Sequence, residues 1–382
     1  MNSMNHENNS NTVTSRLPTG LARVAEFAGE TPARAGGMPA LLFLVAVAAL
    51  LLAGCQHEQP WATGTDHHPT GAQTIGKLES HDPRFFQLVP ATARIEKLAQ
   101  GFAWSEGPIW IKETGFLLFS DVISNTVFKW KADEGITEFL KPSGYTGNVP
   151  RGGEPGSNGL TVDSQGRLTL CEHGDRRVAR LEKDAHKTTL ADKFQGKRLN
   201  SPNDLVYKSN GDLYFTDPPY GLEAREKDPK KELSFQGVYR LKPDGELTVL
   251  TDQLTFPNGL AFSPDEKILY VAVSDPDKAV WMAYDVKADG TIANGRVFFD
   301  ATAWVKTKPG LPDGMKVDKD GNLFATGPGG VLVLAPDGTH LGTINTGEKT
   351  ANCNWGDDGS MLYITANHFL CRIQTKTKGA RF

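Results

Sequence analysis

The chain has 382 residues, of which 39% are hydrophobic, and its formal net charge is −4. This length allows a large core, and a mildly acidic chain without a basic stripe argues against nucleic acid as a partner. The 40 glycines and 23 prolines favour a chain with many turns over a helical one.

The first feature along the chain is an apolar run, residues 40–53, which ends in Leu52-Ala53-Gly54-Cys55. This run is shorter than the roughly 20 residues of a membrane-spanning helix and matches the hydrophobic part of a signal peptide. Its end resembles a bacterial lipobox, which implies cleavage before Cys55 and lipidation of that thiol. We therefore expect residues 1–55 to be a signal peptide of an exported, periplasmic protein, with a lipid anchor as its only membrane contact. The alternative is a buried apolar helix.

Residues 56–91 are polar and rich in His, Gly, Thr and Pro, which predicts a flexible linker. The folded domain is then expected to span residues 92–382. Near its end, Cys353 and Cys371 are close enough in sequence to form a disulfide in an oxidising compartment, or else they are two buried thiols.

Six similar units follow one another between about residues 92 and 378, each with a short alternating strand, a turn with Gly or Asp, and a second strand. The five clearest copies start at intervals of 52, 45, 55 and 55 residues, at Glu106, Asn158, Asn203, Asn258 and Asp313. Such units are typical of propeller blades, so the sequence predicts an all-β fold, a six-bladed β-propeller. A strand at residues 93–98 is expected to complete the last blade and close the ring. The alternative is an open β-sandwich.

The first position of the repeat carries a side-chain oxygen acceptor in all five copies, whereas the sixth copy has Ala351 there, followed by Asn352. The innermost strand of a blade lines the central channel, so equivalent positions point to the same axis. Two carboxylates and several carboxamides suit a hard cation such as calcium, which predicts a metal site on the central axis. The absence of an inward set of His and Cys at this position argues against a dedicated zinc site. The alternative is that the Asn-Gly and Asp-Gly pairs only form turns.

Four motifs in the same order resemble the gluconolactonase family, also called the senescence-marker-protein or regucalcin-like family, over residues 92–378. They are Ser105-Glu-Gly-Pro-Ile-Trp110, Ser201-Pro-Asn-Asp204, Phe256-Pro-Asn-Gly259 and Leu311-Pro-Asp-Gly-Met315. Two further segments, Asp217-Pro-Pro-Tyr-Gly221 and Cys171-Glu-His-Gly174, resemble bacterial members. The resemblance implies a divalent cation, most often calcium, with zinc, magnesium or manganese as alternatives. It implies that the ligands are Glu106, Asn203, Asn258 and Asp313.

The same resemblance implies a metal-dependent lactonase whose partner is a small-molecule sugar lactone of the glucono-1,5-lactone type. In that reaction the cation polarises the lactone carbonyl and Asp313 takes a proton from the attacking water. Alternatively, a water on the metal is the nucleophile and Asp313 mainly positions it. We expect substrate contacts from Asn203, Asn158, His173 and Tyr220. The rival functions are a non-enzymatic propeller that binds a cell-envelope partner, and hydrolysis of other esters or phosphotriesters at the same metal.

Overall fold

The computed structural model of the protein describes residues 73–382. The predicted signal peptide, the lipidated Cys55 and the first part of the predicted linker lie outside these residues and stay predictions. Within residues 73–382, every helix is too short or too polar to cross a lipid bilayer.

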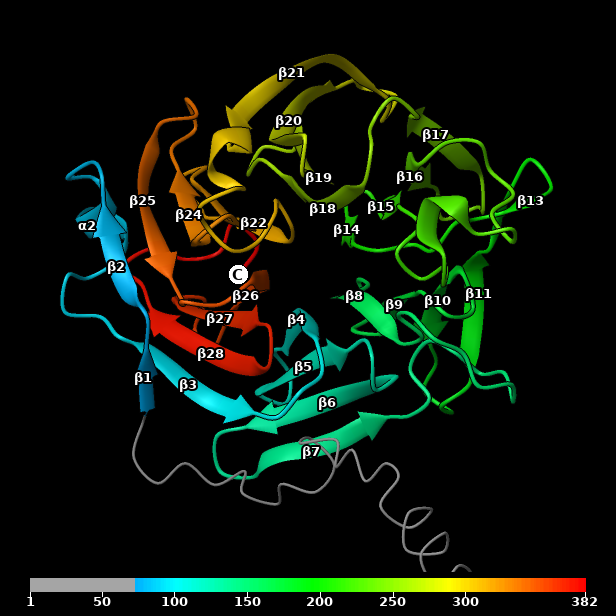
Figure 1. Ribbon diagram of the computed structural model, residues 1–382, viewed down its shortest axis with the longest axis horizontal. Coiled ribbons are helices and arrows are strands. Elements are labelled where there is room, and N and C mark those ends of the chain that lie inside the picture. The colour runs from blue at the N-terminus through cyan, green and yellow to red at the C-terminus, as the bar shows by residue number, and fades with distance from the viewer. Residues whose placement is uncertain (1–72) are drawn as a thin grey trace, which may run out of the picture. The chain divides into compact units, whose positions relative to one another are not determined.

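Six antiparallel sheets surround a central axis, which confirms the expected six-bladed β-propeller (Figure 1). In each blade the first strand of the repeat lies nearest the axis and the next strands of the same repeat lie progressively outward. The innermost strands are β4 (Ser105–Ile111), β8 (Ser157–Val162), β14 (Leu205–Tyr207), β18 (Pro257–Phe262), β22 (Met315–Val317) and β26 (Thr350–Gly356).

The second strands are almost wholly buried because each has a neighbour on both edges and blades on both faces. They are β5 (Phe116–Asp121), β9 (Leu168–Glu172), β15 (Leu213–Asp217), β19 (Ile268–Asp275), β23 (Leu323–Gly327) and β27 (Met361–Ala366). The third strands are β6 (Thr126–Lys131), β10 (Arg177–Leu181), β16 (Gly237–Leu241), β20 (Lys278–Val286), β24 (Gly330–Leu334) and β28 (Phe369–Gln374).

The fourth strands lie further outward, and several of them expose more of their side chains to solvent. They are β7 (Gly135–Leu140), β11 (Lys187–Ala191), β17 (Leu247–Thr251), β21 (Ile292–Asp300) and β25 (His340–Asn345). The connections add a small hairpin and two short 3₁₀ helices, namely β12 (Lys193–Phe194), β13 (Lys197–Arg198), η1 (Arg225–Lys227) and η2 (Thr302–Trp304).

The ring closes through β3 (Ile95–Gln100), which pairs antiparallel with β28 and becomes the outer strand of the last blade. The pairing sets Gln100 opposite Phe369 and Glu96 opposite Arg372. The expectation that the strand near residues 93–98 completes the last blade is therefore confirmed. The first and last parts of the folded domain are held together by one ladder of hydrogen bonds.

The prediction of a flexible linker over residues 56–91 was wrong from residue 73 onward. Here β1 (Gln73–Ile75) pairs with β3, β2 (Lys77–Ser80) pairs with β25, and α2 (Phe85–Leu88) follows. These strands cover the outer edges of the last two blades, and the Phe85 and Val89 side chains are fully buried. The polar composition gave no sign of these strands, because an edge strand that faces solvent needs few apolar residues.

The structure also decides between the two readings of Cys353 and Cys371, which are both buried and free. Ile364 lies opposite both residues in the sheet, so the two cysteines are separated by a full strand. Two strand spacings are about 9–10 Å, and a disulfide needs Cα atoms closer than about 7 Å. These two residues are therefore core thiols.

We predict that Phe85→Ala lowers the free energy of unfolding by about 3–5 kcal/mol, the usual cost of removing a buried aromatic side chain. Phe85 packs against Gly342 of β25 and joins the core of the last two blades. Urea unfolding followed by tryptophan fluorescence measures the change, with exposed Gln87→Ala as the matched control. Equal stability of the two variants would show that residues 73–91 are dispensable.

Candidate active site

Three of the first-position residues, Glu106, Asn158 and Asn258, lie on irregularities of the innermost strands, while Asn203 and Asp313 lie just before β14 and β22. The register shifts between Glu106 and Ile109 in β4, and similar shifts occur in β8, β18 and β26 at the corresponding places. A β-bulge of this kind interrupts the alternation of a strand and changes the direction of a side chain. The bulges therefore let these three first-position side chains point along the axis while the rest of each strand keeps its packing.

The residue after each acceptor makes the inner ends of neighbouring blades touch. The Gly159 N–H donates to the Asn203 carbonyl at 2.8 Å, and the Gly314 N–H donates to the Ala351 carbonyl at the same distance. These contacts bring the main chains so close that a larger residue is excluded. Ala351 accepts the hydrogen bond of the fifth blade's glycine just as Asn203 accepts that of the second blade's glycine. Ala351 is therefore the first position of the sixth blade.

All five predicted acceptors line one pocket of about 450 Å³ at this end of the channel. Four of them are at most 5% exposed, while Asp313 is half-buried. The five residues are Glu106, Asn158, Asn203, Asn258 and Asp313. The structure thus brings the whole predicted set together, and the role of each residue stays a prediction. On the side of the sixth blade, the wall is made by Lys349 and Thr350.

The pKa values of the two carboxyl groups in this pocket, those of Glu106 and Asp313, are both raised. Burial raises the pKa of Glu106, and the nearby Asp204 charge raises it further. Burial also raises the pKa of Asp313 well above its usual range, and the Glu106 and Asp204 charges add to the effect. The pocket therefore favours either protonated carboxyls or a bound positive charge.

The donor set fits a hard cation. Among residues 73–382, no group of three or more His, Cys, Asp or Glu side chains is arranged to hold a metal ion. The floor of the pocket instead combines two carboxylates with carboxamides. The buried Oδ1 of Asn203 has no hydrogen-bond partner, although a buried polar atom normally has one. Carboxylate and carboxamide oxygens are the ligands that calcium prefers. Glu106, Asn203, Asn258 and Asp313 could therefore hold such an ion.

Two of the expected residues are supported by neighbours around the pocket. The Asn258 amide donates to Ser274 Oγ at 3.1 Å, and Ser274 Oγ in turn donates to the Pro312 carbonyl. Tyr220 lines the pocket and stacks on Phe256, with ring centroids 5.6 Å apart. Burial raises the pKa of Tyr220, and the Asp313 carboxylate adds to this effect. Tyr220 therefore stays a neutral hydrogen-bonding group near Asp313.

His173 does not line the pocket, contrary to the expectation of a direct substrate contact. Its side chain is fully buried, with Nε2 at 3.5 Å from Asn203 Nδ2 and Nδ1 at 3.1 Å from Glu154 Oε2. The Cys171–Gly174 segment turns at the end of β9, which carries the imidazole behind Asn203 instead of into the open channel. His173 can act on a substrate only through these two neighbours.

Sequence reasoning missed Asp204 and Asn352, which lie one residue further along the innermost strands. The Asn352 amide donates to Asp204 Oδ2 at 3.3 Å, and both residues are nearly fully buried. They belong to the third and sixth blades, so this hydrogen bond crosses the channel. The signal was present, since the other four copies have glycine at this second position.

The hydrogen bond between Asp204 and Asn352 divides the channel. A second pocket of about 390 Å³ lies at the far ends of the innermost strands and is lined by residues such as Ile109, Val206 and Lys316. Neither pocket includes Asp204 or Asn352. The acceptor pocket therefore opens toward one mouth of the channel only.

Sequence reasoning also missed four charged residues on the wall of the acceptor pocket. They are Glu154, Arg225, Lys308 and Lys349. Each lies in a connection outside the strands of the repeat, where the periodic pattern that revealed the acceptors gives no information.

Comparison with known proteins gives consistent results. Residues 104–368 match the family described as SMP-30/Gluconolactonase/LRE-like region. A gluconolactonase of Zymomonas mobilis is 42% identical over 313 residues, which cover 80% of this chain and 88% of that protein. The solved structure of a gluconolactonase from Xanthomonas campestris has a TM-score of 0.70 and 34% identity, covering 81% of this chain and 98% of that chain. A calcium-binding protein, regucalcin from Agrobacterium tumefaciens, shares the fold at 18% identity, with a TM-score of 0.58 and coverage of 73% and 92%.

We predict that Gly314→Ala destabilises the protein by about 1–3 kcal/mol, the usual cost of overpacking. A Cβ atom on Gly314 would lie 2.0 Å from Asn352 Cγ, and Asn352 is held on both sides. Gly152→Ala is the matched control, because a Cβ atom there meets nothing within 4 Å. Chemical unfolding measures both, and an unchanged Gly314→Ala variant would mean that Asn352 moves aside freely.

Proposed function

This chain belongs to the SMP-30/gluconolactonase/LRE-like family, and on that basis we propose that it is a cation-dependent lactonase for a sugar lactone of the glucono-1,5-lactone type. The family places it among the hydrolases that act on carboxylic ester bonds, and its relatives support a sugar lactone as the substrate class. The observation that carries the proposal is the meeting of Glu106 and Asp313 with three carboxamides on the floor of one pocket.

The cation is proposed from the chemistry of the floor of the pocket. The family includes a calcium-binding protein, and the ligands here would be Glu106, Asn203, Asn258 and Asp313. When bound, a divalent cation of this kind supplies Lewis acidity that polarises a carbonyl oxygen. Its charge would also offset the repulsion that raises the pKa of both carboxyl groups.

Asp313 is the residue best placed to handle the proton of the attacking water. It is half-buried and lines the pocket beside Asn258, whose amide is held by Ser274. As water adds to the lactone carbonyl carbon, Asp313 takes a proton from it. The ring C–O bond then breaks, and the leaving ring oxygen takes this proton from Asp313 to give the hydroxy acid. In the alternative scheme, Asp313 only positions the attacking water, and its place in the pocket is the same.

Three further residues bind and orient the lactone in this proposal. Asn158 and Tyr220 line the wall and offer an amide and a neutral hydroxyl to a polar ligand. Asn203 faces both the axis and the substrate space. A pocket of about 450 Å³ falls within the usual range for small-molecule sites.

We predict that Asp313→Asn lowers kcat for glucono-1,5-lactone by about 10²–10⁴-fold, the usual worth of a general base. Acid release in a pH-stat, corrected for the spontaneous reaction, measures the rate with and without chelator. Chelator should abolish activity and added calcium restore it. Asp320→Asn is the control, a surface carboxylate of the same blade.

Retained activity in Asp313→Asn would eliminate this residue as the base. Activity that survives thorough chelation would eliminate the cation. Turnover of aryl esters or phosphotriesters without any turnover of sugar lactones would favour the broader ester hydrolase.

Glu106→Gln should weaken cation binding, which the melting temperature reports independently of turnover. A ligand that binds only the folded state raises the melting temperature, and the shift increases with the affinity and concentration of the ligand. We predict that calcium raises the melting temperature of the wild-type protein and that the shift is reduced in Glu106→Gln. Glu113→Gln, an exposed residue in the turn that follows β4, should keep the full shift. Equal shifts in all three proteins would place the cation elsewhere.

A further inference from the structure

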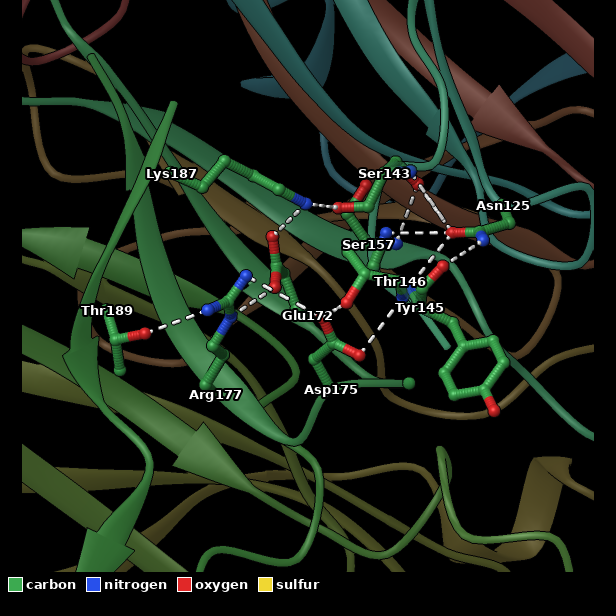
Figure 2. A network of polar contacts seen from close by, with 12 residues as sticks. Asn125, Ser143, Tyr145, Thr146, Ser157, Glu172, Asp175, Arg177, Lys187 and Thr189 are labelled. Atoms are coloured by element: carbon green, nitrogen blue, oxygen red, sulfur yellow. Dashed lines mark hydrogen bonds and ion pairs between the residues drawn. The ribbon is translucent and has the colours of Figure 1, made fainter. Parts of the chain in front are cut away.

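A loop between the first two blades, residues 141–156, brings a charged residue to the acceptor pocket. Its start is held by Asn125, whose Oδ1 accepts hydrogen bonds from the main-chain N–H groups of residues 143–145, at distances from 2.8 to 3.1 Å (Figure 2). Thr146 adds two hydrogen bonds to the Asp175 carboxylate, at 3.1 and 2.7 Å (Figure 2). These contacts fix the direction in which the loop leaves the first blade.

The far end of the loop is held as firmly. The Arg151 guanidinium donates to the Gly174 carbonyl at 3.1 Å and also to the Gly221 carbonyl, so it joins three connections. The Gly156 N–H donates to the Val122 carbonyl at 2.7 Å. Glu154 lies between these two anchors and is therefore held at the wall of the pocket with little freedom.

The Glu154 carboxylate is itself oriented. His173 Nδ1 lies 3.1 Å from Glu154 Oε2, and this imidazole is fully buried, so it cannot turn away to solvent. Oε1 lies 4.0 Å from the guanidinium of Arg225, which comes from η1, lies over the Tyr220 ring and is 61% exposed. The Glu154 charge is close enough to the floor of the pocket to raise the pKa of Asp313 further.

This wall suits a ligand covered with hydroxyl groups. A carboxylate accepts about four hydrogen bonds and a guanidinium donates five, so the two groups together match neighbouring hydroxyls, which both donate and accept. The Glu154 carboxylate approaches His173 through Oε2 alone. Lys308 and Lys349 add further donors to the same wall. An apolar lactone offers these groups no hydrogen-bond partner, whereas a hydroxylated one does.

We propose that Glu154 and Arg225 determine specificity by binding the hydroxyl groups of a polyhydroxylated lactone, and that they discriminate against unsubstituted lactones. This inference rests on the proposed lactonase function and names residues that the axial site does not include. Glu154 is a substrate-binding residue in this scheme, and His173 is the buried neighbour behind Glu154 and Asn203.

The test compares two six-membered lactones that differ in their hydroxyl groups, glucono-1,5-lactone and δ-valerolactone. Glu154→Gln keeps an acceptor for His173 but removes the charge and one acceptor oxygen. We expect kcat/KM for glucono-1,5-lactone to fall about 10–100-fold and that for δ-valerolactone to change less than about 3-fold. Arg225→Gln should act in the same direction. Glu223→Gln is the matched control, since Glu223 pairs with Arg151 at 4.0 Å and does not line the pocket.

A second measurement separates recognition from catalysis. Calorimetric titration with 1,5-anhydro-D-glucitol, which has the ring and the hydroxyls but no carbonyl, reports binding alone. We expect the affinity to fall about 10-fold or more in Glu154→Gln and to stay unchanged in Glu223→Gln.

Each outcome bears on one of the two proposals. Binding of the polyol that depends on Glu154, in a protein that hydrolyses no lactone, would support recognition and reject the lactonase. Hydrolysis of glucono-1,5-lactone with an unchanged preference and unchanged polyol affinity in Glu154→Gln would reject recognition and leave the lactonase standing. Equal losses on both lactones would also overturn the inference, as would a wild-type protein that does not bind the polyol.

Discussion

The acceptor pocket depends on the close main-chain approach of neighbouring blades at the inner ends of their first strands. The N–H of Gly159 reaches the Asn203 carbonyl, and that of Gly314 reaches the Ala351 carbonyl. Since these hydrogen bonds fix the position of one blade relative to the next, they also fix the spacing of the side chains that the bulged residues direct to the axis. The floor of the pocket is therefore as rigid as the ring itself, although its side chains come from five separate blades.

This rigidity has an electrostatic cost that shapes the chemistry of the pocket. Glu106, Asp204 and Asp313 are held near one another by the ring, and burial together with mutual repulsion raises the pKa of each of the first-position carboxyls. A flexible site would let the charges separate. Here they stay together, and the unpartnered Oδ1 of Asn203 faces the same space. Strain of this sort is a common property of sites that bind a cation or move a proton.

Much of the fold could be predicted from the sequence, because the same pattern of strands, turns and first-position acceptors occurs in several copies. The period of the copies indicated six blades, and the shared first position indicated which side chains meet at the axis. Residues that depart from the repeat pattern, or lie outside it, were harder to find. Asp204 and Asn352 replace glycine, a departure that could have been noticed, whereas Glu154 and Arg225 lie in connections whose paths depend on contacts between distant segments. His173 was given the wrong place for the same reason, and the edge strands of residues 73–80 are too short and polar to stand out.

The N-terminal strands have a consequence for how the chain is made. β2 and β3 leave the ribosome early, whereas their partners β25 and β28 are among the last segments synthesised. β3 can pair with β1, but β2 and the other edge of β3 must wait for nearly the whole chain, so the ring closes only when synthesis is almost complete. Closure then becomes a single late event that needs both ends of the domain at once. Before that event the polypeptide is an open arc of blades, and only after it does the acceptor pocket have a complete wall.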